Sequence, residues 1–99
     1  MGRVAIEAEQ EGPRGWTYRV LVHPRAGKGA SAQEHTVRLS YRDHDFWCGG
    51  RLAPSELIRE LLEYVLANRS EAMPDSFDAA RIRRWLPGVD KDFRSVAPQ

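Results

Sequence analysis

Apolar and polar residues alternate along three separate stretches of the chain, at 3–9, 16–23 and 34–40. A period of two sends successive side chains to opposite faces, which is typical of a half-buried strand. The turn-forming residues EGPRG at 11–15 join the first two stretches into a predicted hairpin. The side chains expected on the buried faces are Val4, Ile6 and Ala8; Trp16, Tyr18, Val20 and Val22; and His35, Val37 and Leu39.

A helical period replaces this alternation after residue 53. Pro54 suits the first position of a helix, and Leu52 lies five residues before Leu57, the spacing of a hydrophobic staple. Asn68 is expected to end the helix in the left-handed conformation. The apolar residues form one stripe with charged residues opposite, so we predict a long amphipathic helix. The stripe consists of Leu57, Ile58, Leu61, Leu62, Val65 and Leu66.

Two shorter helices are also predicted. Ser40 and Asp43 resemble a helix start, and Gly49 offers a left-handed stop one or two turns later. Asp78 is expected to cap a second short helix that ends before Pro87. The residues expected to be buried in this second helix are Ala80, Ile82, Trp85 and Leu86.

These elements predict an α+β fold, in which a three-stranded antiparallel meander is covered on its apolar face by one long helix and one or two short helices. Residues 1–99 are expected to form a single small domain. The Gly-rich segment 24–33 is expected to be a mobile loop. The tail at 95–99 should fray, whereas Phe93 is expected to dock on the core.

Composition narrows the class of protein. Fifteen Lys and Arg balance fourteen Asp and Glu, so no global field attracts the chain to nucleic acid or to anionic lipid. No apolar run is long enough for a membrane span, and the N-terminus does not resemble a signal peptide. The single cysteine, Cys48, excludes an intrachain disulfide. A cytoplasmic location without membrane contact is therefore expected.

The sequence PSELIRE at 54–60 and the strand before it resemble the ribbon-helix-helix family of DNA-binding dimers. The resemblance covers about a third of the chain. It implies that Thr36, Arg38 and Ser40 on the strand read the major groove, with Arg42 and Arg51 on phosphates. The chain departs from the family in two respects: only about two helical turns fit between Ser40 and Gly49, and a preceding hairpin can pair with the strand edge that a ribbon needs free.

A larger part of the chain is similar to a family of small bacterial proteins. The shared features are a strand that ends in Leu-Ser, an aromatic residue before Gly-Gly, a helix led by Pro, and a Phe-Asp helix with an aromatic-x-Pro end. In this chain they correspond to Leu39-Ser40, Trp47 before Gly49-Gly50, Pro54, Phe77-Asp78 and Trp85-x-Pro87. The resemblance implies that residues 34–94 form one unit, and it implies no activity and no functional residue.

Three short segments invite a chemical interpretation. Adjacent residues of a helix point about 100° apart, so at most two of Asp43, His44 and Asp45 can face one metal ion, and no metal site or cofactor is expected. Cys48 has no histidine beside it in the sequence, so it is expected to be a small buried residue rather than a nucleophile. GKGAS at 27–31 lacks the spacing of a phosphate-binding loop.

The sequence therefore favours a non-enzymatic binding domain whose partner is another protein or a second copy of itself. The argument is the content of large aromatic side chains, which exceeds what a core of this size easily encloses. Phe46, Trp47 and Trp85 are the predicted interface residues. The alternative is a transcriptional regulator of the ribbon-helix-helix type, which reads DNA through Thr36, Arg38 and Ser40.

Overall fold

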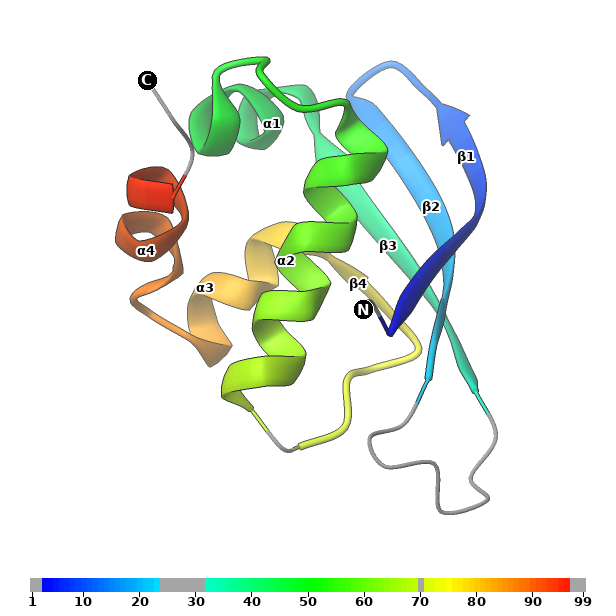
Figure 1. The fold of residues 1–99 in the computed structure, drawn as a ribbon. Helices are drawn as coiled ribbons and strands as arrows, with labels where there is room; N and C mark the ends of the chain where they lie inside the picture. Colours follow the sequence, from blue (N-terminus) through cyan, green and yellow to red (C-terminus); the bar gives the residue numbers. More distant parts are fainter. Residues whose placement is uncertain (1–2, 24–31, 70, 97–99) are drawn as a thin grey trace.

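The computed structural model describes residues 3–23, 32–69 and 71–96. Its sheet has four strands in the order β1-β2-β3-β4 (Figure 1). The first three strands pair antiparallel as a meander, and β4 pairs parallel to β3. The strands are β1 (Val4–Glu11), β2 (Gly15–Val22), β3 (Gln33–Ser40) and β4 (Ser76–Asp78).

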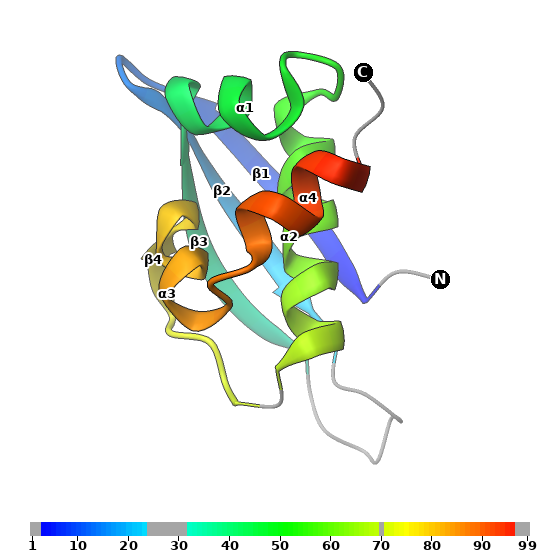
Figure 2. The same ribbon diagram turned by 90° about the vertical axis from the view of Figure 1, so that its left-hand side faces the viewer.

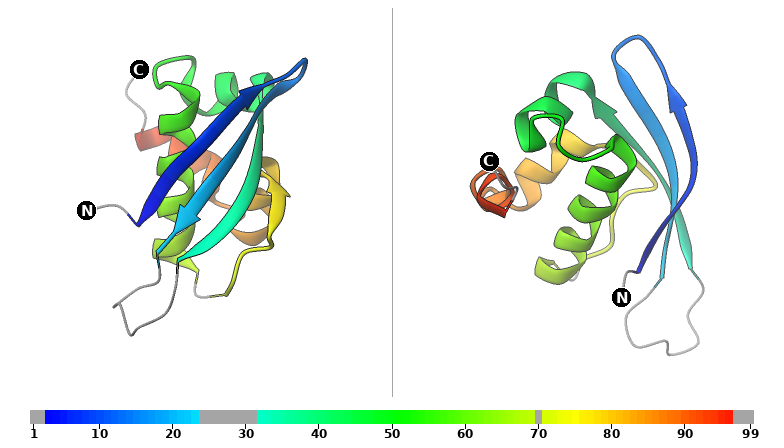
Figure 3. Two further views of the ribbon diagram at one scale, coloured as in Figure 1. Left: turned by 90° about the vertical axis from the view of Figure 1, so that its right-hand side faces the viewer. Right: turned by 45° about the horizontal axis from the view of Figure 1, so that its top comes forward.

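The described helices lie on one face of this sheet, so the fold is a two-layer α+β sandwich. Figure 2 shows α1, α3 and α4 on the helical side, and the left panel of Figure 3 shows the opposite face of the sheet with no described helix across it. The helices are α1 (Tyr41–Cys48), α2 (Pro54–Asn68), the 3-10 turn η2 (Ala79–Arg81), α3 (Ile82–Trp85) and α4 (Val89–Val96).

The core lies between the two layers. The apolar stripe of α2 is buried against it as the helical period predicts, and the predicted inner faces of β2 and β3 also point there. Burial of this stripe is the main apolar contribution of the helical layer. The fully buried side chains of the sheet and of α2 are Tyr18, Val20, Val37, Leu39, Phe77, Leu57, Ile58, Leu61, Leu62 and Val65.

The α+β class and the antiparallel pairing of the first three strands agree with the prediction, but the sheet is four-stranded and mixed, because β4 adds to it in parallel. Ser76, Phe77 and Asp78 pair with residues 36–38 of β3, and the Thr36 amide donates to the carbonyl of Asp75 at 2.8 Å. Three residues are too few to display an alternating pattern, which is why the sequence did not reveal this strand. The addition makes β3 a central strand, with a neighbour on each side.

A bulge in β1 corrects the predicted face of its second half. The pairing register shifts between Ile6 and Ala8, so Ala8 opposes the exposed Arg19 while Glu9 opposes the buried Tyr18. One extra residue reverses the in-out order of everything that follows it. Ala8 therefore lies on the open face of the sheet, and Glu9 and Glu11 lie on the helical face.

The predicted helix starts are confirmed. Ser40 caps α1 by accepting from the Asp43 amide at 3.0 Å, Pro54 is the first residue of α2, and Asp78 accepts from the Ala80 amide at 2.9 Å. The prediction that Asn68 ends α2 in the left-handed conformation is wrong. Asn68 remains helical and its side-chain amide donates to the Tyr64 carbonyl at 2.8 Å, while the following residue is extended.

The C-terminal part holds more helix than the sequence predicts. Ala79 rather than Ala80 is the buried alanine of η2, because η2 is wound as a tighter 3-10 turn. Helix α4 occupies part of the segment expected to fray, and Phe93 docks on the core as predicted. Of the predicted mobile loop at 24–33, Gln33 belongs to β3 and residues 24–31 lie outside the described residues. Residues 97–99 of the tail also lie outside them.

None of the helices in the described ranges combines the length and the apolar character that crossing a bilayer requires.

Candidate protein interface and acid–aromatic corner

Helix α1 is short but sharply defined at both ends. Ser40 caps its start, and Gly49 ends it in the left-handed conformation at φ 60°, where its amide donates to the Asp45 carbonyl at 2.7 Å. One side of the helix is buried through Asp43, Trp47 and Cys48. The other side is exposed to solvent, and we call it the α1 surface. It consists of Tyr41, Arg42, Asp45 and Phe46.

The α1 surface carries both of the large hydrophobic side chains that are exposed in the described part of the chain. Tyr41 is 38% exposed and Phe46 is 39% exposed. Scattered apolar side chains are normal on a protein surface, but here both lie on one eight-residue helix. The predicted interface residue Phe46 is therefore accessible to a partner.

Trp47, the second predicted interface residue, is buried. Only 1% of it is exposed, and its indole Nε1 donates to Asp90 Oδ1 at 2.8 Å. In this fold Trp47 is therefore not accessible to a partner, unlike Phe46. The helical turn places residue 47 about 100° away from residue 46, so the two aromatic side chains face opposite environments.

Arg83 of α3 connects α1 to α4 beneath the α1 surface. Its Nε donates to Asp90 Oδ1 at 2.8 Å, and its Nη2 donates to Asp43 Oδ1 at 3.1 Å. The guanidinium carbon lies 4.4 Å from the ring centroid of Trp47 and 5.4 Å from that of Phe46. Burial opposes the charge, but the hydrogen bonds to Asp90 and Asp43 outweigh it and raise the pKa of Arg83. Phe46 is thus supported from below by a cation that two carboxylates hold in place.

Trp85, the third predicted interface residue, is half-buried. Its ring packs 5.0 Å from that of Phe77, and the guanidinium carbon of Arg69 lies 4.5 Å from its ring centroid. The structure therefore uses Trp85 to link α3 to the sheet and to the end of α2.

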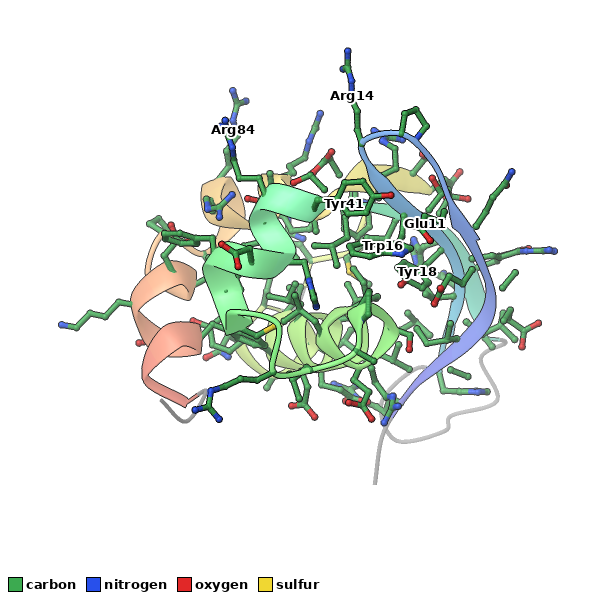
Figure 4. All side chains as sticks on the ribbon, turned by 90° about the horizontal axis from the view of Figure 1, so that it is seen from above. Glu11, Arg14, Trp16, Tyr18, Tyr41 and Arg84 are labelled. Carbon is green, nitrogen blue, oxygen red and sulfur yellow. The ribbon has the colours of Figure 1, made fainter. Side chains whose placement is uncertain are left out.

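A second group of side chains gathers where α1 meets the β1–β2 hairpin. The Trp16 ring packs edge to face against Tyr41 at 4.7 Å and against His44 at 5.2 Å. The Tyr41 hydroxyl donates to Glu11 Oε2 and to the Gly12 carbonyl, each at 2.7 Å. Figure 4 shows Glu11, Trp16, Tyr18 and Tyr41 together between α1 and the hairpin. We call this group, together with Glu9, the acid–aromatic corner.

Tyr18 forms the buried side of the acid–aromatic corner. The residue is fully buried, and its hydroxyl is the only buried side-chain polar atom in the described residues without a hydrogen bond of good geometry. Burial is the largest cause that raises the pKa of Tyr18, a side-chain hydrogen bond to Glu9 comes next, and the charges of Glu9 and Glu11 raise it further. The hydroxyl therefore faces the two acids of β1.

This raised pKa predicts alkaline destabilisation. In the unfolded chain the Tyr18 hydroxyl ionises near pH 10, whereas in the folded protein it keeps its proton to higher pH. The folded state then binds more protons, so stability is intact below about pH 10 and falls above it by about 1.4 kcal/mol per pH unit. Urea unfolding measured between about pH 9 and 11 should therefore show that the free energy of unfolding falls less steeply with pH in Tyr18→Phe than in the unmodified protein. Identical slopes for the two proteins would contradict this prediction.

The residues predicted to read DNA do not form a free ribbon. Thr36 and Arg38 lie on the face of the sheet away from the helices, and the Ser40 hydroxyl is engaged as the cap of α1. Strand β3 is hydrogen-bonded to β2 on one side and to β4 on the other. The ribbon-helix-helix arrangement requires a free edge along 34–40 for a second chain, and in this fold β4 occupies residues 36–38 of that edge. Arg42 belongs to the α1 surface, and Arg51 lies in the exposed connection to α2.

The side chains of Asp43, His44 and Asp45 point in different directions, as the geometry of a helix predicts. Asp43 binds Arg83, His44 Nε2 donates to the Leu52 carbonyl at 2.7 Å, and Asp45 is exposed. No group of three or more His, Cys, Asp or Glu in the described residues could hold a metal ion. Cys48 is buried, and its Sγ donates to the His44 carbonyl at 3.2 Å.

The fold and these two sites define the class of the protein as a two-layer α+β domain with an aromatic-bearing surface helix. Comparison of the chain with protein-family models, with curated proteins and with solved structures finds no match. The argument about function therefore depends on the chain's own geometry.

Sequence reasoning missed three contributors to these sites. Tyr41, the second exposed aromatic residue, is the first residue after the predicted cap Ser40. Its exposure follows from which side of α1 faces the core, and the sequence pattern of this short helix does not show that side. Glu9 was assigned to the opposite face because the bulge leaves no local signal. No sequence pattern predicts the role of Arg83, since its partners lie forty residues before it and seven residues after it in the chain.

Proposed function

We propose that this chain is a small non-enzymatic binding domain that associates with a second copy of itself through the α1 surface. The observation that carries the proposal is the position of Tyr41 and Phe46, the two exposed large hydrophobic side chains, on one capped helix. Aromatic residues that are held in place before binding lose little conformational entropy when they bind. The contact between Arg83 and Phe46 supplies that support.

The order of residues on α1 favours a second copy over an unrelated protein. In a two-fold dimer the same patch meets itself, so residue i contacts residue j and j contacts i. Two antiparallel copies of α1 would place Arg42 opposite the partner's Asp45 and Tyr41 opposite the partner's Phe46. Both charge pairs and both aromatic pairs are then complementary.

The expected affinity is low. The eight residues of α1 extend about 12 Å. A contact made through so short a helix buries less than the roughly 800 Å² per partner of a standard interface. A dissociation constant on the order of 100 μM is therefore expected, together with rapid exchange.

Phe46→Ala tests the proposal. The variant removes the central aromatic contact and is expected to weaken self-association roughly tenfold or more, measured by sedimentation equilibrium at protein concentrations from about 20 μM to about 1 mM. Arg59→Ala, at an exposed position of α2, is the control and should associate like the unmodified protein. Unchanged association of Phe46→Ala, or a strict monomer before any substitution, would count against the proposal.

A further inference from the structure

Exposed arginines come from three segments that meet at α1, and together we call them the basic ridge. The segments are the β1–β2 turn, α1 itself, and η2 with α3. The members of the ridge are Arg14, Arg42, Arg81 and Arg84. Within the described ranges none of these side chains forms an ion pair. Their positive charge is therefore available to an anionic partner.

One contact joins the hairpin turn to the start of α1. The Tyr41 amide donates to the Arg14 carbonyl at 2.9 Å, so Arg14 lies beside the first turn of the helix. Arg42 is the next residue of α1 after Tyr41, and its side chain is exposed. The first two members of the ridge are therefore neighbours in space, although they belong to distant parts of the sequence.

A second contact joins α3 to the same turn of α1. Arg83 Nη2 donates to Asp43 Oδ1 at 3.1 Å, which places Arg84, the next residue of α3, close to this helix. Arg81 lies three residues before Arg84, and residues three apart on a helix share one side. Figure 4 shows Arg14 and Arg84 projecting from the same side of the molecule. The ridge therefore runs from the hairpin past α1 to α3.

Two exposed aromatic rings lie within this arginine-rich surface. Tyr41 and Phe46 are 38% and 39% exposed and stand five residues apart, which is about 7.5 Å along the helix axis. Both rings are held in place: the Tyr41 hydroxyl donates to Glu11, and the guanidinium carbon of Arg83 lies 5.4 Å from the Phe46 ring centroid.

Arginines beside fixed aromatic rings are the arrangement that binds single strands of nucleic acid, with phosphates on the cations and bases stacked on the rings. A duplex hides the faces of its bases inside the stack. An acidic peptide carries negative charge but no bases. The combination of cations and rings therefore favours a single strand over both.

We infer that the basic ridge and the two exposed rings of α1 bind single-stranded nucleic acid. No residue of β3 takes part, so this mode differs from the reading of duplex DNA by Thr36, Arg38 and Ser40 that the ribbon-helix-helix resemblance implies. The inference does not rest on self-association, but both use the α1 surface and therefore exclude each other. Because the charges of the whole chain nearly cancel, the affinity comes from these local contacts.

The test measures the fluorescence anisotropy of a labelled oligothymidylate of about 12 nucleotides, which is within the usual size of a single-strand site. The full chain is titrated to about 100 μM in about 50 mM salt, where the expected dissociation constant is on the order of 10 μM. About four phosphate contacts predict a slope of about −2.8 for log K against log salt, so binding in about 100 mM salt should be about sevenfold weaker. The comparison probes are an abasic strand with the same phosphates and a labelled oligoglutamate, and each should bind at least about tenfold more weakly.

Exposed charged residues provide matched variants. Arg14→Gln and Arg84→Gln should each weaken binding of the oligothymidylate about fourfold and make the salt slope shallower by about 0.7. Arg59→Gln, at an exposed position of α2 outside the ridge, is the control and should bind normally. Asp45→Arg replaces the exposed carboxylate of α1 with a cation and should tighten binding severalfold. The same change should abolish self-association, so it affects the two functions in opposite directions.

Three results would overturn the inference. The first is an oligothymidylate that does not bind at about 100 μM protein in about 50 mM salt. The second is equal binding of the abasic strand or of oligoglutamate, which would reject nucleic acid as the partner and assign the ridge to acidic polymers. The third is equal weakening by Arg59→Gln, which would show that the ridge arginines form no particular site. If Asp45→Arg bound the strand more tightly but self-associated normally, the proposed dimer would fail and this inference would stand.

Discussion

Gly15→Ala is expected to lower the free energy of unfolding by about 3 kcal/mol. A Cβ at this position would overlap the carbonyl oxygen of Leu39 and lie 2.6 Å from the Cα of Ser40. Both atoms belong to the backbone of β3, which is fixed between two neighbouring strands and cannot yield as a side chain could. Gly15 is therefore required by the close approach of β2 to β3.

The same substitution should also disturb α1. Ser40, the partner of Gly15 across the strands, caps this helix, and the Tyr41 amide donates to the Arg14 carbonyl at 2.9 Å. Urea unfolding monitored by tryptophan fluorescence measures the loss. Gly12→Ala in the same hairpin turn is the control, because the nearest atom to its Cβ is 3.9 Å away. Equal effects of the two alanines would contradict the close approach of β2 to β3 at Gly15.

Arg83→Met is expected to lower the free energy of unfolding by about 2 kcal/mol. The substitution keeps much of the apolar stem but leaves Asp43, which is only 8% exposed, without its cation. Removing one partner of a buried ion pair costs about 3–5 kcal/mol, and the smaller figure here allows for the 30% exposure of the Arg83 side chain. The aromatic contacts of Arg83 with Trp47 and Phe46 are lost as well.

Arg84→Met is the matched control for Arg83. Arg84 is the next residue of the same helix, is exposed and points away from the body of the molecule in Figure 4. Its replacement should change stability by less than about 0.5 kcal/mol. In the double variant Arg83→Met with Asp43→Asn, part of the lost stability should return, because no unpaired charge remains buried. Equal losses of stability for Arg83→Met and Arg84→Met would contradict a stabilising role of the ion pairs that Arg83 forms with Asp43 and Asp90.

The sequence predicted those parts of the fold that repeat a local pattern. The strand faces around Tyr18 and Val37 and the stripe of α2 each depend on several residues in one period, and the caps at Ser40 and Asp78 depend on short-range hydrogen bonds. The bulge at 6–8 left no such pattern, because one inserted residue reverses a face without changing composition. Strand β4 exists only because β3 presents an edge for it.

The candidate sites were predicted less completely, since each is assembled from distant segments. The content of aromatic residues indicated both Phe46 and Trp47 as interface residues. Neighbouring residues of a helix point about 100° apart, so Phe46 is exposed and Trp47 is buried. The bonds from Arg83 to Asp43 and Asp90 follow from the packing of three helices, which no spacing in the sequence encodes. The approach of Glu11 to Tyr41 likewise depends on where α1 begins.

The central claim is that the α1 surface recognises its own copy, and charge exchange on this helix tests it most directly. Asp45→Arg alone would place like charges opposite each other in the antiparallel dimer and should abolish association in sedimentation equilibrium. The double variant Arg42→Asp with Asp45→Arg restores complementary pairs and should associate about as tightly as the unmodified chain. If the double variant remained as monomeric as Asp45→Arg, or if Asp45→Arg associated normally, the α1 surface would not be the interface.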